Sequence, residues 1–428
     1  MQNWRIKLSL FLNYFVFAIL LNSVGTVILQ VQNNYGITQG SASVLEAFKD
    51  LSIAITSFIV SSYIVRIGYK NSMLIALAIV TIACLMMPNI GGFAMTKVLF
   101  AATGVSFALI KVSVYATIGL VTNNKKDHAS FMNFIESFFM IGILAGYFIF
   151  GAFADDKDPQ STEWLKVYYV LAGISVAAFL LLLSSPLNES SVKNETAKPL
   201  SQDFTEMLQL IIVPLVLIFI LSAFFYVLIE QSIMSWLPTF NKQVLKLPTA
   251  LSIQMASILA ASTAIGRFIA GIVLRKIHWL AVIIFCLIAS ATLVILAIPL
   301  AHDIDASNIS SWSDAPIVAF IFPMIGLLIA PIYPAINSVI LSTLPAKKHA
   351  PMSGLIVVFS ALGGTTGSII TGHIFESYGG EKAFYFSLIP IIILIVLLIA
   401  FNKLQKKYTA VSEAQLPVIT DPIAEKIK

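Results

Sequence analysis

The chain has 428 residues, of which 58% are hydrophobic and 11% are charged. Soluble domains carry about 25% charged and about 45–50% apolar residues, so this composition excludes an ordinary soluble enzyme, a disordered protein and a secreted disulfide scaffold. The two cysteines, Cys84 and Cys286, both lie in apolar runs, which argues against a disulfide framework or a metal cluster. The mean hydropathy of +0.91 agrees, and the sequence predicts an integral membrane protein.

Apolar segments long enough to cross a bilayer core of about 30 Å, which takes about 20 residues, recur along the chain. We predict twelve transmembrane helices, at residues 8–31, 43–65, 72–89, 95–121, 130–154, 165–185, 207–238, 250–275, 279–300, 315–344, 351–375 and 382–402. A polar stretch separates the sixth segment from the seventh. The expected fold is an all-α membrane protein, with six-helix bundles at 1–185 and 207–405, a cytoplasmic linker at 186–206 and a cytoplasmic tail at 406–428.

The basic residues give the orientation. The chain has 26 Lys and Arg against 21 Asp and Glu, a net charge of +5. Most basic loop residues fall on the side of the two chain ends, so the positive-inside rule places both termini in the cytoplasm. They are spread over many loops and form no patch of the kind that binds nucleic acid, so a nucleic-acid partner is excluded.

The two halves of the sequence resemble each other. The fourth segment, read from Gly104, matches the tenth, read from Gly326, in the placement of small residues. Glycines at 142, 146 and 151 recur at 363, 367 and 372 with the same spacings, which let helix backbones approach closely. Two related six-helix halves are typical of a transporter that binds its solute between them, near the middle of the membrane.

The loop after the second segment, residues 61–70, is similar to the loop motif of the major facilitator superfamily, which combines glycines, an acid and basic residues. Val65 stands in place of the acid, and Ser61 in place of the first glycine. A counterpart follows the eighth segment, at residues 266–276. The resemblance extends over essentially the whole chain and implies gating roles for three arginines, Arg66, Arg267 and Arg275.

Ionisable residues inside the predicted spans are functional candidates, because a charge at the bilayer centre costs about 2.5–3.5 kcal/mol on insertion scales. Seven stand out: Glu46, Lys49, Asp50, Lys111, Glu136, Glu230 and Arg267. Buried carboxylates suit proton uptake and release, so the proton-coupling candidates are Asp50, Glu230 and Glu46.

Two of these pairs have a structural alternative. Lys111 and Glu136 lie at similar depths, so we expect them to pair or to share the substrate, and a structural ion pair is the alternative. Lys49 can instead extend to the membrane surface and pair there with Glu46.

Amides and aromatic rings in the spans resemble the lining of a sugar site. With the charged Lys111 and Glu136 included, there are nine substrate-binding candidates: Asn22, Lys111, Tyr115, Glu136, Gln231, Trp236, Gln254, Tyr333 and Asn337. Residues 230–238 resemble the branch of the superfamily that contains the fucose–proton symporters. Residues 330–334 include two prolines, which predict a broken helix at membrane depth, where irregular backbone occurs only inside protein or along a cavity.

No phosphate-binding loop, metal-ligand spacing or nucleophile elbow occurs, so we expect no cofactor and no enzyme activity. The sequence predicts a secondary active transporter of the inner membrane, monomeric, that moves a small polar solute, preferably a sugar, by proton-coupled alternating access. The main alternative is symport or antiport of an anionic or zwitterionic solute bound by Lys111. An integral membrane enzyme is the alternative outside transport.

Overall fold

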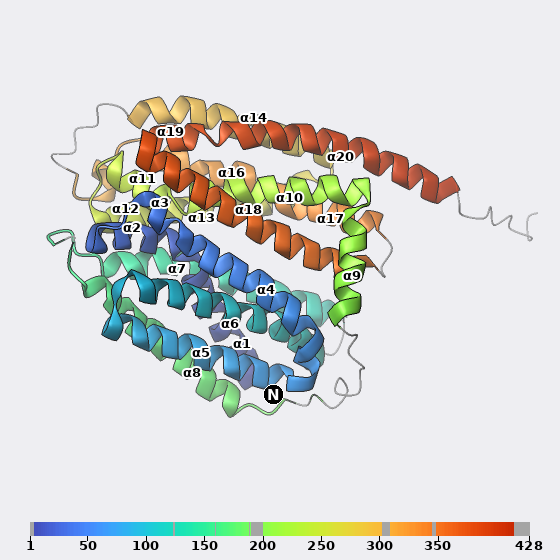
Figure 1. Cartoon of the computed structure of the whole chain (residues 1–428), viewed down its shortest axis with the longest axis horizontal. Helices are drawn as coiled ribbons and strands as arrows, with labels where there is room; N and C mark the ends of the chain where they lie inside the picture. Colours follow the sequence, from blue (N-terminus) through green and yellow to red (C-terminus); the bar gives the residue numbers. More distant parts are fainter. Residues whose placement is uncertain are drawn as a thin grey trace, which may run out of the picture.

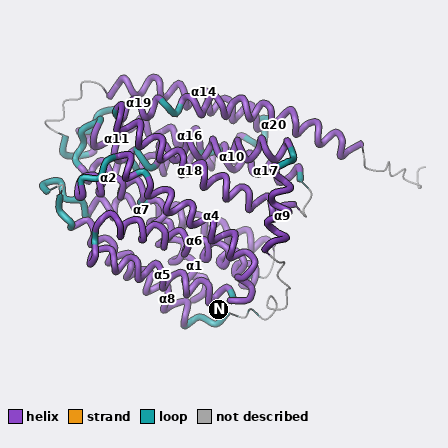
Figure 2. Tube along the Cα trace, viewed as in Figure 1, coloured by secondary structure: helices purple, strands orange, loops and turns teal. Residues whose placement is uncertain are grey.

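The computed structural model describes residues 4–122, 125–158, 160–187, 189, 200–301, 309–344 and 348–414. These residues form helices and connecting loops, without a strand among them (Figure 2). The long helices lie side by side in Figure 1, with the first half of the chain below the second half. We call the end of the bundle where the two ends of the described chain lie the terminal side (towards the bottom and right in Figure 1), and the opposite end the far side.

The first half of the chain, as far as it is described, consists of α1 (Trp4–Asn22), α2 (Val24–Tyr35), α3 (Gln39–Ala42), α4 (Val44–Ile67), α5 (Tyr69–Ile90), α6 (Gly92–Val121), α7 (Lys125–Ala152), the 3-10 helix η1 (Glu163–Lys166) and α8 (Val167–Leu183). Within this half, α1 packs against α7 and α8, α4 packs against α6, and α5 packs against both α6 and α8. These contacts make one bundle, seen in the lower part of Figure 1.

The second half of the described chain consists of α9 (Leu200–Ile211), α10 (Pro214–Met234), α11 (Leu237–Gln243), α12 (Thr249–Met255), α13 (Ser257–Val273), α14 (Trp279–Ala297), η2 (Ile298–Ala301), η3 (Trp312–Asp314), α15 (Val318–Ile321), η4 (Phe322–Met324), α16 (Ile325–Ile329), α17 (Ile332–Thr343), α18 (His349–Tyr378), α19 (Gly380–Tyr385) and α20 (Leu388–Ala414). Here α10 packs against α18 and α20, and α16 packs against α13 and α14. The short α9 lies steeply across the terminal side (Figure 1).

Eleven stretches of described helix are long and apolar enough to cross a membrane. The remaining expected span corresponds to α4, which carries Glu46, Lys49 and Asp50 and is not among the eleven. Each of the twelve predicted segments is therefore occupied by helix, and the predicted all-α membrane fold is confirmed. The proposed linker and tail lie largely outside the described residues, although α9 already begins at Leu200 and α20 continues to Ala414.

Several spans are broken helices. The seventh span breaks after Met234, because Pro238 near the start of α11 has no N–H to bond the Met234 carbonyl four residues earlier. The tenth span breaks between α16 and α17, where Pro331 precedes α17, as the two prolines of that segment predict. The first span is also broken, at Ser23, without a proline.

The repeated glycines allow close helix packing within each half. A Cβ at Gly142 on α7 would lie 2.8 Å from the Phe15 carbonyl oxygen on α1. Cβ atoms at Gly363 and Gly367 on α18 would each lie 2.3 Å from a carbonyl oxygen of α10. Real Cβ atoms do not approach other atoms so closely, so these glycines set the distance between the paired helices.

The third glycine of each set faces the other half of the molecule. A Cβ at Gly151 on α7 would lie 2.8 Å from Cγ of Gln254 on α12. A Cβ at Gly372 on α18 would lie 2.7 Å from Cβ of Ser43, which precedes α4. The corresponding glycines of the two halves therefore make corresponding contacts across the interface.

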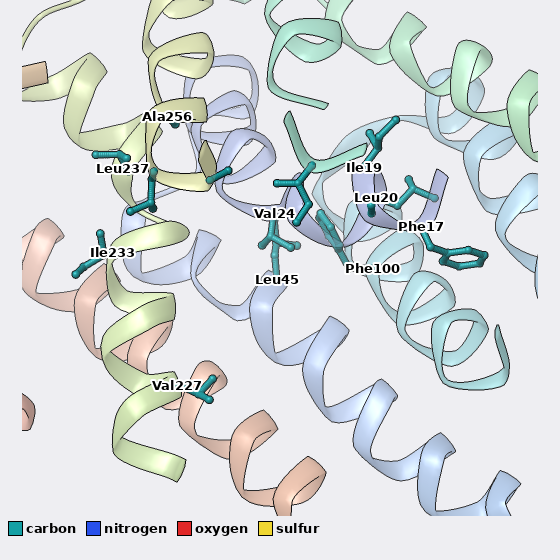
Figure 3. Packing of buried hydrophobic residues seen from close by; sticks show 14 of the residues in the cluster. Phe17, Ile19, Leu20, Val24, Leu45, Phe100, Val227, Ile233, Leu237 and Ala256 are labelled. Carbon is teal, nitrogen blue, oxygen red and sulfur yellow. The ribbon is translucent and has the colours of Figure 1, made fainter. Parts of the chain in front are cut away.

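The two halves meet on the far side. There α3 and α4 pack against α18, α7 packs against α12 and α13, and α2 packs against α11. The Gly40 N–H donates to Glu376 Oε2 at 2.8 Å, and the Ala250 N–H donates to Asp156 Oδ1 at 3.1 Å. Buried side chains of the two halves also gather near this interface, including Leu45 of the first half (Figure 3). These contacts close the far side of the bundle.

Candidate functional site

A buried ionic cluster lies on α4 at the interface between the halves. The exposed fractions of Glu46, Lys49 and Asp50 are 0%, 6% and 8%. Lys49 Nζ forms an ion pair with Glu46 Oε1, and it lies 3.4 Å from Asp50 Oδ1 and 3.5 Å from the Leu21 carbonyl oxygen. The structure thus brings together the two α4 carboxylates that we expect to couple protons, with Lys49 between them. Lys49 is buried in this cluster rather than extended to the membrane surface.

The second half of the molecule supplies groups to this cluster. The hydroxyl of Ser235, at the end of α10, donates to Glu46 Oε2 at 2.9 Å. On α18, a Cβ at Gly364 would lie 2.5 Å from Asp50 Oδ2 and 3.2 Å from Cγ of Gln231. The carboxylates of Glu46 and Asp50 therefore both contact the opposite half. The sequence did not predict these contacts.

A polar cluster in the first half contains Lys111, Tyr115 and Glu136. The Tyr115 hydroxyl donates to Glu136 Oε1 at 2.8 Å. Lys111 lies close enough to Glu136 to interact electrostatically, but no described carboxylate oxygen lies within 4.0 Å of its Nζ. Tyr14 on α1 packs on Tyr115, with ring centroids 6.3 Å apart. Lys111 is exposed although it lies within the span of α6.

A similar cluster in the second half contains Glu230, Tyr226, Tyr333 and Arg267. The Tyr226 hydroxyl donates to Glu230 Oε1 at 2.8 Å, and its ring stacks on Tyr333 with centroids 5.4 Å apart. The Tyr333 hydroxyl lies 2.9 Å from Ser360 Oγ. Arg267 and Lys49 are both close enough to Glu230 to interact electrostatically, which links this cluster to the ionic cluster on α4.

The two clusters have the same composition. Each has a tyrosine pair, a carboxylate that accepts a hydrogen bond from one of those tyrosines, and a nearby cation. Tyr14 and Tyr226 also occupy matching places, because each lies the same number of residues before the break of its span, at Ser23 and at Ser235. Neither Tyr14 nor Tyr226 was among the residues predicted from the sequence. The one sequence feature that could have identified them is their equal spacing from the breaks of the two spans, and those breaks are known only from the structure.

The remaining substrate-binding candidates are spread more widely. The Asn22 amide donates to the Ala18 carbonyl of its own helix. Gln254 accepts from Trp312 on the far side, apart from both polar clusters. Trp236 is fully buried and donates its indole N–H to the Ser368 carbonyl oxygen at 3.1 Å, so in this conformation it packs α11 against α18.

Gln231 and Asn337 lie beside the clusters. The Gln231 side chain lies 3.3 Å from Ser235 Oγ, and Asn337 lies one turn beyond Tyr333 on α17. The Asn337 amide oxygen is buried and has no hydrogen-bond partner among the described residues.

The three expected gating arginines differ in their surroundings. Arg66 lies near the end of α4, and its side chain is outside the described residues. Arg267 is exposed on α13, where it is near Glu230, and Arg275 is exposed just after that helix. Arg267 is thus placed beside a proton-coupling candidate as well as in the loop-motif counterpart.

A pocket of about 570 Å³ lies on the far side, apart from these clusters. Its lining includes Gln243, Lys246, Tyr378 and Lys382, and none of the candidate residues contributes to it. Among the described residues, no group of three or more His, Cys, Asp or Glu side chains is placed to hold a metal ion.

Comparison with known proteins identifies the fold. A bacterial homolog of the human lysosomal transporter Spinster, in an inward-facing and unoccupied conformation, has a TM-score of 0.74 at 15% identity, over 95% of this chain and 98% of that chain. The nucleoside transporter NupG has a TM-score of 0.70 at 16% identity, over 93% and 99%. A D-xylose–proton symporter has a TM-score of 0.71 at 13% identity, over 93% and 97%.

At these identities the similarity establishes a shared fold. No curated protein sequence matches the chain. The family model described as Major Facilitator Superfamily matches residues 10–350, which is most of the chain. With that match and with transporters as its structural neighbours, this multi-pass membrane protein is a secondary transporter rather than an enzyme and belongs to the Major Facilitator Superfamily.

Proposed function

We propose that this protein imports a sugar across the cytoplasmic membrane by proton-coupled alternating access. The observation that carries the proposal is the buried cluster of Glu46, Lys49 and Asp50, which touches the second half through Ser235 and Gly364. Opening of the far side separates these contacts. The free energy of protonating the carboxylates is therefore linked to the movement of the halves, as coupled transport requires.

The orientation follows from the distribution of charge. Basic loop residues are concentrated on the terminal side, so we place that side, and both chain termini, in the cytoplasm. The far side then faces outward. A molecule that is closed on the far side exchanges protons and solute with the cytoplasm. Since one chain contains both halves, we propose the monomer as the transporting unit.

The two tyrosine clusters favour a sugar as the solute. Tyr115 and Tyr333 are partly exposed and offer apolar ring surface to a sugar, while Glu136 and Glu230 offer acceptors for its hydroxyls. Each cluster also holds one cation near enough to its carboxylate to interact electrostatically, so the two charges partly offset each other and the solute need not be charged. The resemblance of residues 230–238 to fucose–proton symporters and the fold shared with a D-xylose–proton symporter support the same choice.

One observation favours a second candidate, an anionic or zwitterionic solute. Lys111 is exposed within its span and has no described carboxylate oxygen within 4.0 Å of its Nζ. An ammonium group in that position is available to a solute carboxylate or phosphate. In that case Lys111 is the main determinant of binding, and the tyrosines are secondary.

An uptake screen in proteoliposomes separates the two candidates. Neutral sugars, organic acids and amino acids are offered with and without an inward proton gradient, to the wild type and to Lys111→Gln. The sugar proposal predicts gradient-dependent uptake of a neutral sugar that persists, with altered KM, in Lys111→Gln. Uptake of an anion that disappears in Lys111→Gln, with no sugar uptake in the wild type, overturns it in favour of the second candidate.

A further inference from the structure

The residue at the break of the seventh span touches the first half through both its backbone and its side chain. Ser235 is 3% exposed and ends α10. Its carbonyl oxygen would lie 2.8 Å from a Cβ at Gly25, so its backbone rests directly on α2. Its hydroxyl donates to Glu46 Oε2 at 2.9 Å. The break of the seventh span is thus held by two elements of the opposite half.

The single hydroxyl hydrogen of Ser235 has two possible acceptors, and the geometry favours Glu46. A serine hydroxyl carries one hydrogen, and Ser235 Oγ has two neighbouring acceptors, Glu46 Oε2 at 2.9 Å and Gln231 Oε1 at 3.3 Å. An ionised carboxylate accepts roughly twice as strongly as a neutral group. The nearer and stronger acceptor receives the proton, so the hydrogen bond of Ser235 crosses the interface.

Glu46 links this bond to the rest of the ionic cluster. Its other oxygen pairs with Lys49, which also reaches Asp50. The charged groups near Glu46 are Lys49 and Asp50 on α4 itself, and Glu230 on α10, which interacts with Lys49. The other helices packed here face the cluster with backbone or glycine: α1 through the Leu21 carbonyl, α6 through Gly104, and α18 through Gly364.

The titratable groups of α18 lie farther along the interface. His373 and Glu376 meet Gly40 on α3 rather than Glu46. The Ser235 hydroxyl is therefore the hydrogen-bond donor that the second half presents to the α4 cluster within the described residues.

We propose that Ser235 is a positioning residue that holds the far side closed through its hydrogen bond to Glu46, and so conveys the protonation state of the α4 cluster to the second half. This role rests on the proposed function, in which that cluster binds the coupled proton. When the far side opens, α10 leaves α4, the bond breaks, and Glu46 loses a donor. Because the bond is stronger to ionised than to protonated Glu46, it contributes a pH-dependent part to the equilibrium between the closed and open far side.

The test measures that equilibrium directly. Spin labels at Ser41→Cys on α3 and Tyr378→Cys at the end of α18, both exposed positions, report the distance across the far side in a background lacking Cys84 and Cys286. Loss of a hydrogen bond to a charged group should shift the ratio of long to short distances by about tenfold in Ser235→Ala.

Ser232→Ala is the matched control. Ser232 is also a buried serine of α10, but its hydroxyl donates to the Gly367 carbonyl at 3.2 Å, within its own half. Its loss should leave the ratio and its pH dependence unchanged. In Ser235→Ala the pH dependence of the ratio should differ from that of the wild type, which a mere packing role of the serine does not produce.

A double-mutant cycle with Glu46→Gln completes the test. If Ser235 acts through Glu46, the two changes together shift the ratio by less than the product of the single shifts. Full additivity, or equal shifts in Ser235→Ala and Ser232→Ala, overturns the proposal. These measurements need no solute, so a protein that shows the expected shifts but no proton-driven uptake refutes the proposed function and leaves the role of Ser235 standing.

Discussion

The carboxylate of Asp50 on α4 lies directly against Gly364 on α18, in the space that a side chain at that glycine would occupy. A Cβ at Gly364 would come within 2.5 Å of Asp50 Oδ2. The two residues belong to opposite halves, and Asp50 is 8% exposed in this arrangement. The absence of a side chain at Gly364 therefore permits the halves to close over a proton-coupling candidate.

Gly364→Ala should favour the conformation that is open on the far side. The added methyl group must displace the Asp50 carboxylate whenever the halves close, and overpacking of this kind costs about 1–3 kcal/mol. We expect a shift of about fivefold or more toward long distances across the far side, measured with the same spin-label pair. Gly173→Ala on α8, where a Cβ meets nothing within 4 Å, is the control and should leave the distribution unchanged. A Gly364→Ala distribution equal to the wild type contradicts the account.

Asp50→Asn and Glu230→Gln should separate transport from the proton gradient. Each variant keeps the size and hydrogen-bonding ability of the side chain but removes its capacity to bind and release a proton. Accumulation against a concentration gradient should fall by tenfold or more, on the order of 1.4 kcal/mol or greater in driving force, while exchange of labelled for unlabelled solute persists. Glu163→Gln, in an exposed ion pair with Lys166, should behave as the wild type. Unchanged accumulation in both variants argues against these residues as coupling sites.

Tyr115→Phe and Tyr226→Phe should have similar effects on solute affinity, because the two tyrosines donate equivalent 2.8 Å hydrogen bonds to Glu136 and Glu230. Each bond positions a carboxylate that can accept a solute hydroxyl. If the tyrosine clusters bind solute, loss of either bond should weaken one solute hydrogen bond of about 0.5–1.5 kcal/mol, a rise in KM of roughly two- to tenfold in each variant. Tyr169→Phe, an exposed tyrosine of α8, serves as the control. A KM that rises in only one of the two variants refutes a symmetric site.

Glu189→Gln should lower the thermal stability of the first half. Val65 leaves the loop motif without its acid, and the first turn of α5 contains none. Glu189 Oε1 instead accepts the Lys70 N–H at 2.7 Å, and so caps α5 from the linker side. Loss of the carboxylate charge at such a cap costs about 0.5–2 kcal/mol, measured as a lower Tm of the purified protein. A Tm equal to that of Glu163→Gln shows that the contact does not stabilise α5.

Much of the fold was predictable from the sequence because the length of an apolar run is set by bilayer thickness. Each expected span lies on helix, and the prolines near Pro331 predicted the break of the tenth span. The break of the first span at Ser23 was not predicted, since it contains no proline and depends on packing against the rest of the bundle. The amphipathic α9 was not predicted as a separate helix: the expected boundary between the linker and the seventh span, at residues 206 and 207, falls inside it.

The charged members of the candidate site could be selected from the sequence alone. Glu46, Asp50 and Glu230 stand out within the predicted spans because a charge inside a membrane is energetically costly. Neutral groups carry no such signal: a buried Ser235 or Tyr226 is common in membrane helices, and its partner lies far away in the chain. Trp236 was expected to bind solute from its residue type, whereas in this conformation it is buried against α18.

Coupling between sugar and protons is measured directly as proton movement evoked by the solute. Purified protein is reconstituted in liposomes that contain a pH-sensitive dye, without any imposed gradient, and neutral sugars are added outside. We predict that a transported sugar acidifies the liposome interior, and that the acidification disappears in Asp50→Asn and Glu230→Gln. Sugar entry with no change of internal pH, or proton movement that follows only anions and requires Lys111, contradicts the account.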